Sequence, residues 1–425
     1  MSAGMRRAAR VWRAIGASLL LGGWFGGARI VAAEPLDRRI PGLFGGTLST
    51  SIVPQISDRR PDVQQLAVAA RFSGLSAALA AARSQAPVPS ATGALRFEWD
   101  DDLDLYVRSV ESLGPLIAER ASTLGRHAAT LSVSYTHVDF DTLEGDRLSN
   151  LRTSQSALSP AFVSGLPAGD RTKAADNQLQ TQLDLGLGFD LLFLTAAYGV
   201  TDTIDVSLAL SVNQARMHAS AMASITDPHD DQGAFFTVNQ KGVIIRGAGE
   251  NCATDFRCAV DHFDDSKVGT GDLFLRGKWH FADTEYVDFA TAGILTLPTG
   301  NANDFLGFHD PTFTPWLIMS KTFDRVSPHV NLGYSFRSGA DVSQAQWIAG
   351  ADVRTFDWLT LAADFLGFHD DKRDGINDDV FQSAIGFKLN PIANLVVGAS
   401  FQFPLNSDGL RADVIYTGQA EYTFY

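Results

Sequence analysis

The sequence has little charge and, beyond its N-terminal region, no long apolar run. Charged residues make up 19% of the 425 residues, which is low for a soluble protein. The mean hydropathy is nevertheless zero, well below that of helical membrane proteins. No stretch of about 18 apolar residues follows the N-terminus, so no membrane-spanning helix is expected. Alternating β-strands hide their hydrophobicity from such averages, so a membrane β-barrel remains open.

Basic residues are scarce as well. The chain has 34 Lys and Arg against 48 Asp and Glu, and its formal net charge is −14. Nucleic-acid binding requires a basic surface, so this balance argues against nucleic acid as a partner. Acidic surface loops are the simplest explanation of the excess carboxylates.

Cysteine occurs only twice, as Cys252 and Cys258, in a polar stretch without strand character. In an exported protein such a pair is most simply a loop disulfide. A metal site with His262 is the alternative, but it requires more ligands at tighter spacing.

The N-terminus has the pattern of an export signal. Its positive region contains Arg6, Arg7, Arg10 and Arg13. An apolar stretch follows over residues 14–25, and the small residues 31–33 precede Glu34. The pattern predicts a cleaved signal peptide over 1–33. A membrane anchor helix is the alternative, weakened by several glycines and by Arg29.

Residues 34–126 differ in character from the rest of the chain. The Ala-rich stretch 62–83 has apolar residues at helical spacing, and residues 86–93 form a Pro/Ser/Gly linker. A short hairpin is expected around residues 100–102, followed by a helix-like stretch over 114–125. This region is predicted to be a plug inside a barrel or a periplasmic segment.

From His127 onward, strand-like segments alternate with turns, and many of them alternate apolar and polar residues over about ten positions. Twelve such segments are expected, with two of uncertain pattern, at 128–141, 180–198, 204–217, 270–281, 286–297, 312–323, 328–337, 346–355, 358–367, 379–389, 392–403 and 412–425. In the last one, Phe424, Tyr422 and Tyr416 share one face, while Thr423 and Glu421 share the other. A soluble protein rarely ends on such an exposed apolar edge, whereas a barrel that closes in a bilayer does.

The connections between these segments fall into two classes. Short turns are expected at 199–203, 282–285, 324–327, 356–357 and 390–391. Longer loops are expected at 142–179, 218–269, 298–311, 338–345, 368–378 and 404–411. The two classes alternate along the chain, as periplasmic turns and extracellular loops do in an outer-membrane barrel. The predicted fold class is therefore all-β: an antiparallel transmembrane β-barrel of about 12 strands over 127–425, with a partly helical N-terminal plug or periplasmic segment.

Several stretches resemble one family of bacterial outer-membrane barrels. They include SLGPLIAERASTLGRHAATLSVSYTHVDFDTLEGDRL, YGVTDTIDVSL, VGTGDLFLRGKWHF, LTLPTGNANDFLGF, SPHVNLGYSF and FPLNSDGLRADVIYTGQAEYTF. The family is labelled after the MetA pathway of phenol degradation and is similar in architecture to the fatty-acid and aromatic-hydrocarbon uptake barrels. The resemblance covers about residues 94–425 and implies a channel, with hydrophobic or aromatic solutes. It brings no catalytic residues.

The strand parity predicts a mixed set of charged side chains that face the lumen. The candidates for solute binding are Arg276, Lys278, His280, His329, Arg337, Arg354 and Asp364. Asp184, Asp190, Asp205, Asp352, Lys388 and Glu421 are expected on the same side. Opposite charges could simply neutralise one another and fill the lumen, or they could form a constriction that selects a solute. Arg276, Lys278 and His280 would form an anion-attracting ladder on one strand.

Two other patterns are candidates for a site at the extracellular rim. The heptapeptide DFLGFHD occurs at 304–310 and again at 364–370, with a His–Asp pair in each copy. These pairs could anchor the strand ends, bind a cation or serve hydrolysis. A nearby loop is rich in carboxylates, and Asp370, Asp371, Asp374 and Asp378 are its candidate ligands for a structural calcium ion, the only cofactor expected. An acidic loop that shares divalent ions with lipopolysaccharide is the simpler reading.

The expected function is passage of small molecules through the outer membrane of a Gram-negative bacterium, by a protein that is not an enzyme. The expected partners are outer-membrane lipid, lipopolysaccharide, the barrel-assembly machinery and a small solute. A hydrolase with a site in the external loops and a structural or adhesive barrel without transport remain as alternatives.

Overall fold

The computed structural model describes residues 35–39, 94–95, 97–100, 105–108, 112–156, 164–165, 168–175, 178–226, 236–238, 244–246, 258–338, 343–371 and 379–424. The chain divides into residues 1–34 and 35–425, and every described residue belongs to the second unit. The predicted signal peptide and Cys252 lie outside the described residues, as does the side chain of Cys258. No described helix is both long and apolar enough to span a membrane.

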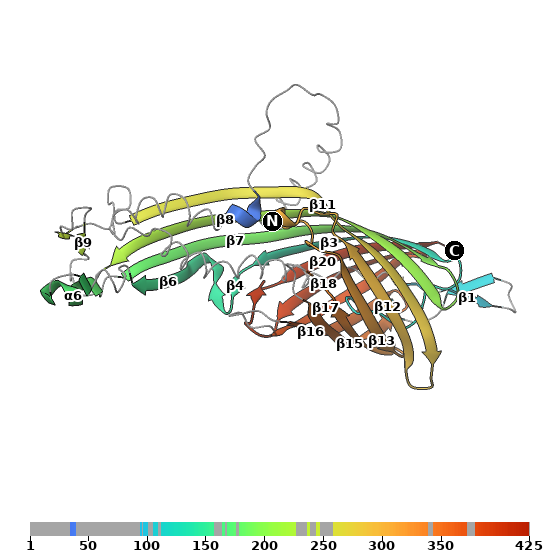
Figure 1. Cartoon of the computed structure of the whole chain (residues 1–425). Coiled ribbons are helices and arrows are strands. Elements are labelled where there is room, and N and C mark those ends of the chain that lie inside the picture. The colour runs from blue at the N-terminus through green and yellow to red at the C-terminus, as the bar shows by residue number, and fades with distance from the viewer. Residues whose placement is uncertain are drawn as a thin grey trace, which may run out of the picture. The chain divides into compact units, whose positions relative to one another are not determined.

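Twelve antiparallel strands form a closed barrel (Figure 1). They are β3 (Ala129–Phe140), β7 (Gln178–Gly199), β8 (Ile204–Thr226), β11 (Cys258–Asp283), β12 (Asp288–Leu297), β13 (Thr312–Ser320), β14 (Val326–Ser335), β15 (Gln344–Phe356), β16 (Leu359–Asp370), β17 (Asp379–Ile392), β18 (Leu395–Pro404) and β20 (Ile415–Phe424). Each pairs with its neighbours in chain order, and β3 closes the barrel by pairing with both β20 and β7. The predicted strand count and antiparallel order are confirmed.

Shorter elements accompany the barrel. β1 (Phe97–Asp100) and β2 (Leu105–Arg108) form the expected hairpin. The others are β4 (Thr142–Leu143), β5 (Asp146–Arg147), η3 (Leu148–Asn150), β6 (Leu151–Ser156), α6 (Ala168–Ala175), β9 (Phe236–Val238), β10 (Ile244–Arg246), η4 (Ala302–Asp304) and β19 (Leu410–Arg411). Tight turns such as 357–358 lie at one end of the barrel and the longer loops at the other. The end with the tight turns is assigned as periplasmic by the usual rule for outer-membrane barrels.

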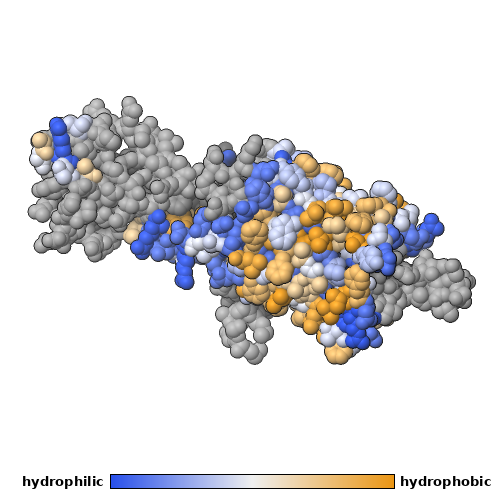
Figure 2. Space-filling model, turned by 90° about the horizontal axis from the view of Figure 1, so that it is seen from below, coloured by the Kyte–Doolittle hydropathy of each residue, from blue (hydrophilic) through white to orange (hydrophobic). Residues whose placement is uncertain are grey.

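The outer face of the barrel is apolar, because alternate residues of each strand point outward. On β8 the outward side chains of Ile204, Val206, Leu208 and Leu210 are between 39% and 51% exposed. On the last strand Phe424 is 46% exposed, and its polar neighbour Thr423 is fully buried. Figure 2 shows the result as an orange area over the barrel wall with blue regions toward its edges. The predicted inside and outside faces are therefore confirmed for these strands.

Three strands continue well beyond the barrel. β7, β8 and β11 contain 22, 23 and 26 residues, whereas about 9–11 residues suffice to cross a bilayer. β11 pairs with β12 only from Leu273 to Asp283, and its residues 258–270 pair with β8 alone. β6 adds to the free edge of β7 over residues 151–156. The four strands form a ribbon on the side of the long loops, and Figure 1 shows β7, β8 and β11 running past the shorter strands.

The apolar face of β7 changes sides along its length. Near the periplasmic end, Leu194 and Tyr198 point outward and are 49% and 42% exposed. In the ribbon, the inward side chains from Leu183 to Leu191 are apolar and buried, while Asp184 is exposed. The expectation that Asp184 and Asp190 face the lumen is wrong, because the ribbon lies outside the bilayer and its outward face is polar.

Asp190 is buried although it points outward, because neighbouring side chains cover it. It accepts hydrogen bonds from Tyr135 Oη and Arg216 Nη1, and its Oδ1 lies 2.7 Å from His137 Nδ1. Gly188 leaves room for this arrangement, since a Cβ there would lie 2.9 Å from Arg216 Nη2. The result is a polar cluster on the outer wall, just beyond the apolar band.

Candidate functional site

An extended segment, residues 112–126, lies inside the barrel and is called the lumen strap. Its backbone N–H groups bond to side chains of the inner wall rather than to one another. The bonds are Leu113 N to Thr360 Oγ1 (2.8 Å), Ile117 N to Asp364 Oδ2 (3.1 Å), Glu119 N to Asn331 Oδ1 (2.6 Å), Ala121 N to Ser320 Oγ (2.8 Å) and Leu124 N to Asp205 Oδ2 (3.0 Å). Side chains of four strands, β8, β13, β14 and β16, therefore accept the backbone N–H groups of the strap.

The strap does not form the helix predicted over 114–125. A helix satisfies its N–H groups with carbonyls four residues earlier, whereas here inward carboxylates, amides and hydroxyls accept them. Gly114 and Gly125 also have φ values of 88° and 92°, which interrupt a helix at both ends. At its C-terminal end the strap passes into β3, where His127 N donates to Gly199 O at 2.8 Å.

Two members of the predicted ladder on β11 hold the strap. Arg276 forms an ion pair with Glu119. Lys278 Nζ donates to the carbonyl oxygen of Arg120 at 2.6 Å and to that of Ser122. His280, the third member, lies with its Nε2 3.0 Å from Asp283 Oδ1. All three side chains face inward as predicted. Atoms of the strap contact the charged groups of Arg276 and Lys278.

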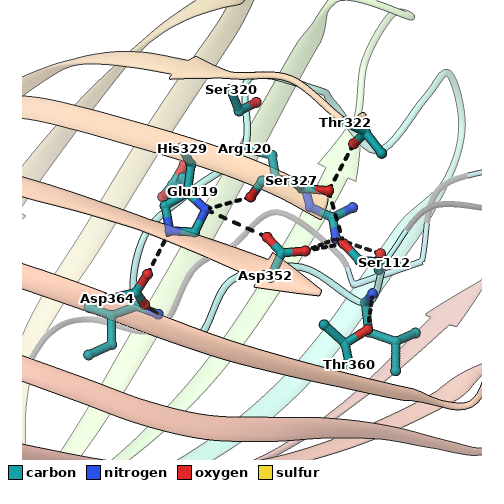
Figure 3. A network of polar contacts seen from close by, with 12 residues as sticks. Ser112, Glu119, Arg120, Ser320, Thr322, Ser327, His329, Asp352, Thr360 and Asp364 are labelled. Atoms are coloured by element: carbon teal, nitrogen blue, oxygen red, sulfur yellow. Dashed lines mark hydrogen bonds and ion pairs between the residues drawn. The ribbon is translucent and has the colours of Figure 1, made fainter. Parts of the chain in front are cut away.

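His329 and Asp364 belong to a second buried network, shown in Figure 3. His329 Nε2 is 2.6 Å from Asp364 Oδ1, and its Nδ1 is 3.5 Å from Asp352 Oδ1. Asp352 in turn accepts a hydrogen bond from Ser112 Oγ and lies 3.7 Å from Arg120 Nη2. All three ionisable wall residues are buried, and each carboxylate also contacts the strap. The Ser112 hydroxyl donates a hydrogen bond to the Asp352 carboxylate. The network therefore has a structural role, in which it ties the strap to the barrel wall.

The remaining lumen candidates lie near the ends of their strands. The Arg337 guanidinium packs on the Phe308 ring, with Cζ 4.9 Å from the ring centroid. Arg354 is half-buried on β15, and its backbone N donates to Arg325 O at 2.8 Å. Arg337 belongs to the side of the long loops and Arg354 to the side of the tight turns.

The carboxylates proposed for calcium are only partly described. Asp370 accepts a hydrogen bond from Gln344 Nε2 at 2.7 Å, and Asp371 accepts one from Tyr334 Oη. Asp374 and Asp378 lie outside the described residues. Among the described residues, no group of three or more His, Cys, Asp or Glu is arranged to hold a metal ion. The calcium site stays a prediction.

The two DFLGFHD copies adopt different structures. Residues 364–370 form the end of strand β16, where His369 Nδ1 is 2.8 Å from Asp379 Oδ1 on an exposed surface. Residues 304–310 begin at the last residue of η4 and turn inward, so that Phe305 and Leu306 are both only 5% exposed. Identical residues are thus used once as wall and once as an inward-folded loop.

A cavity of about 140 Å³ lies in the lumen between the strap and this loop. Ile117 and Glu119 of the strap contribute to its lining, and so does Phe308 of the loop. This space is called the lumen chamber. Its other apolar lining residues are Leu191, Phe193, Phe274, Ile294, Trp316, Ile318, Ile348, Leu366 and Phe368.

Backbone–side-chain contacts fix the loop that bounds the chamber. Asp272 Oδ2 accepts a hydrogen bond from Phe308 N at 2.8 Å, and its Oδ1 accepts one from Gly300 N at 3.1 Å. Asn213 Nδ2 donates to Leu306 O at 2.8 Å. These inward residues of β8 and β11 hold Phe308 in place. Asn213 was not among the residues predicted for the site, and the inward parity of β8 was its only signal. Phe308 belongs to the first DFLGFHD copy, which was a candidate for the extracellular rim and not for the lumen.

Comparison with known proteins gives similarity of architecture at low identity. No protein-family model matches the chain, so the family named above stays a resemblance. No curated protein matches it. An outer membrane channel from Pseudomonas putida F1 is 12% identical, with 72% of this chain and 98% of that chain covered and a TM-score of 0.40. The CymD monoaromatic hydrocarbon channel is 8% identical, with 72% and 91% covered and a TM-score of 0.35. A Pseudomonas aeruginosa FadL homologue is 10% identical, with 72% and 91% covered and a TM-score of 0.33. Likeness at this level does not bear on function.

Proposed function

We propose that this protein is an outer-membrane channel for small hydrophobic or aromatic molecules, and that the lumen strap closes it. The observation that carries the proposal is the lumen chamber, an aromatic-lined cavity enclosed by the barrel wall and bounded by the strap. A concave space lined mainly by apolar and aromatic side chains with a few polar groups suits a bound small molecule.

Export and assembly complete the proposal. Residues 1–33 would be removed as a signal peptide, and the barrel-assembly machinery would insert the barrel beside lipopolysaccharide. Residues 34–126 would act as the plug, with the strap as its described part. Arg276 and Lys278 would then hold the closed state, and they would line the passage once the strap leaves. His280, His329, Arg354 and Asp364 would contribute to the same charged lining.

Removal of the plug tests the channel directly. The full chain and a variant without residues 35–126 are reconstituted separately and compared by planar-bilayer conductance and by liposome swelling. We expect low conductance for the full chain and a large increase for the shortened one, because the bonds that place the strap in the lumen are lost. Silence of both proteins in both assays would instead support a structural or adhesive barrel.

The hydrolase alternative has its own test. Hydrolysis of ester lipids or peptides by the purified protein, abolished by His309→Ala or Asp310→Ala, would favour it. The channel proposal expects no such activity, and it expects unaltered conductance in both variants.

A further inference from the structure

The first described residues of the chain, 35–39, lie on the side of the long loops. They form one helical turn over 36–39, drawn in blue beside the ribbon in Figure 1, and Leu36 is only 1% exposed. Residues 94–95 lie near the opposite end of the barrel, where Ala94 N donates a hydrogen bond to Glu421 Oε1 of β20. The start of the predicted plug is therefore docked at a place of its own, and residues 35–39 are called the outer latch.

The two ends of the outer latch are attached to different parts of the fold. Arg39 Nη2 donates to Asp265 Oδ2 at 3.0 Å, and Arg39 Cζ lies 5.7 Å from the centroid of the Phe263 ring. Asp265 and Phe263 belong to the part of β11 that continues beyond the barrel. Leu36 N donates to Asp304 Oδ1 at 3.2 Å. Because Asp304 begins the inward loop 304–310, the latch joins the ribbon to the loop that bounds the lumen chamber.

The inward loop and the outer latch contact β11 at successive heights. Asp272 accepts a hydrogen bond from Phe308 N of the loop, and a Cβ on Gly269 would lie 3.0 Å from Leu306 Cδ1. Asp265, which binds the latch, lies about 23 Å farther out along the strand than Asp272. The lumen strap bounds the same chamber from the side of the tight turns. The latch and the strap are therefore attached on opposite sides of the chamber.

We propose that the outer latch is a second closure, which holds the inward loop over the lumen chamber from the extracellular side. This inference rests on the proposed function and adds the regulation of the same chamber. The strap closes the chamber toward the periplasm, and the latch keeps the loop closed toward the outside. A solute passes only when both have opened, so the effects of loosening each closure should multiply.

The latch is the weaker of the two closures. The side chains of Arg39 and Asp265 are 30% and 19% exposed, so water and salt screen their ion pair. Lys278, which holds the strap, is only 2% exposed. We therefore expect a smaller change in channel opening when the latch is weakened than when the strap is weakened.

Charge reversal in the full chain tests the latch by planar-bilayer conductance. Arg39→Glu places two carboxylates opposite each other and should raise the ratio of open to closed channels about fivefold, the upper range for a partly exposed ion pair. Asp265→Arg should act in the same direction, and the variant with both changes should return to the wild-type ratio. Arg38→Glu is the matched control, since Arg38 is the exposed neighbour of Arg39 and its substitution makes the same change of charge. Heat-modifiable gel mobility reports whether each variant is folded.

Two further measurements locate the closure. Arg39→Glu should raise the open ratio by the same factor in the Lys278→Met background, because the two closures act in series. A protease that cuts after aromatic residues, added to the outside of intact cells, should cleave the inward loop faster in Arg39→Glu. The rate of cleavage in Arg38→Glu and in Lys278→Met should equal that of the wild type.

Two results overturn the inference. One is equal open ratios and equal loop cleavage in Arg39→Glu and Arg38→Glu. The other is failure of the reversed pair to restore the wild-type values. Both leave the channel intact if removal of the plug opens it. Conversely, faster loop cleavage in Arg39→Glu, without conductance in any variant, keeps the latch as a contact that holds the loop and removes the channel.

Discussion

Replacing Lys278 by methionine should release the lumen strap. Lys278 is 2% exposed, and its ammonium group donates to the carbonyl oxygens of Arg120 and Ser122. The methionine side chain is about as long as that of lysine, but it is apolar and cannot donate a hydrogen bond. The closed state then loses both hydrogen bonds, and the two carbonyls remain in the lumen without this donor. The open state loses little, because an uncovered lysine would be solvated by lumen water.

The size of the effect follows from the two bonds. Hydrogen bonds to charged groups contribute about 1.5–3 kcal/mol each, and the lower value gives about 3 kcal/mol for the pair. Since about 1.4 kcal/mol corresponds to a tenfold change, the ratio of open to closed channels should rise about a hundredfold. Open probability in planar bilayers measures this ratio directly.

Lys321→Met provides the control. Lys321 Nζ also makes two hydrogen bonds, to Thr284 O at 2.7 Å and to Asp288 Oδ1 at 2.8 Å, but at the periplasmic rim. The same substitution there should leave the open probability at the wild-type value. Equal open probabilities for both folded variants would refute the view that Lys278 holds the strap.

Three further predictions concern other parts of the fold. Gly307→Val should displace the inward loop and raise the conductance of the plug-deleted protein, because a Cβ at this position would lie 2.7 Å from Gly300 Cα; proteolysis of the loop reports the displacement. Arg411→Met should lower the stability of the outer loops by about 2 kcal/mol, since Arg411 is 2% exposed and its Nη2 donates to Phe381 O at 2.8 Å. The protease resistance of residues 405–414 measures this loss, and the gel mobility of the barrel should stay unchanged. Deletion of Tyr425 should leave membrane insertion intact, because the outward apolar face is already complete at Phe424, which is 46% exposed; loss of heat-modifiable mobility would contradict this.

The barrel could be predicted from the sequence because a bilayer imposes a simple rule on each strand. Ile204 to Leu210 on β8 show it: apolar side chains face lipid at every second position. The rule failed on β7, where Leu191, Leu192, Phe193 and Leu194 follow one another and either parity is apolar. The length of the ribbon outside the membrane decides which part of β7 meets lipid and so which face there is apolar, and that length depends on pairing with β8 and β11.

The site was predictable only in part. Parity was enough to place Arg276, Lys278 and His329 in the lumen. Parity could not predict their partners in the strap, because the contact between Lys278 and Arg120 joins positions 158 residues apart. The stretch 114–125 also has helical spacing by itself. It stays extended because wall side chains accept its N–H groups, and this competition does not exist outside the barrel.

The change of sides on β7 also fixes how deeply the protein is immersed. The outward face carries Leu194, which is 49% exposed, and four residues farther along it carries Asp190 with Arg216 and Asp139. Four residues of a strand span about 13 Å. If the barrel moved outward by that distance, leucine would enter water. If it moved inward, an arginine and a carboxylate would enter hydrocarbon. In a membrane of different thickness, the bilayer must therefore become locally thicker or thinner around this protein. The barrel cannot shift along the membrane normal instead, because its apolar band has no spare width.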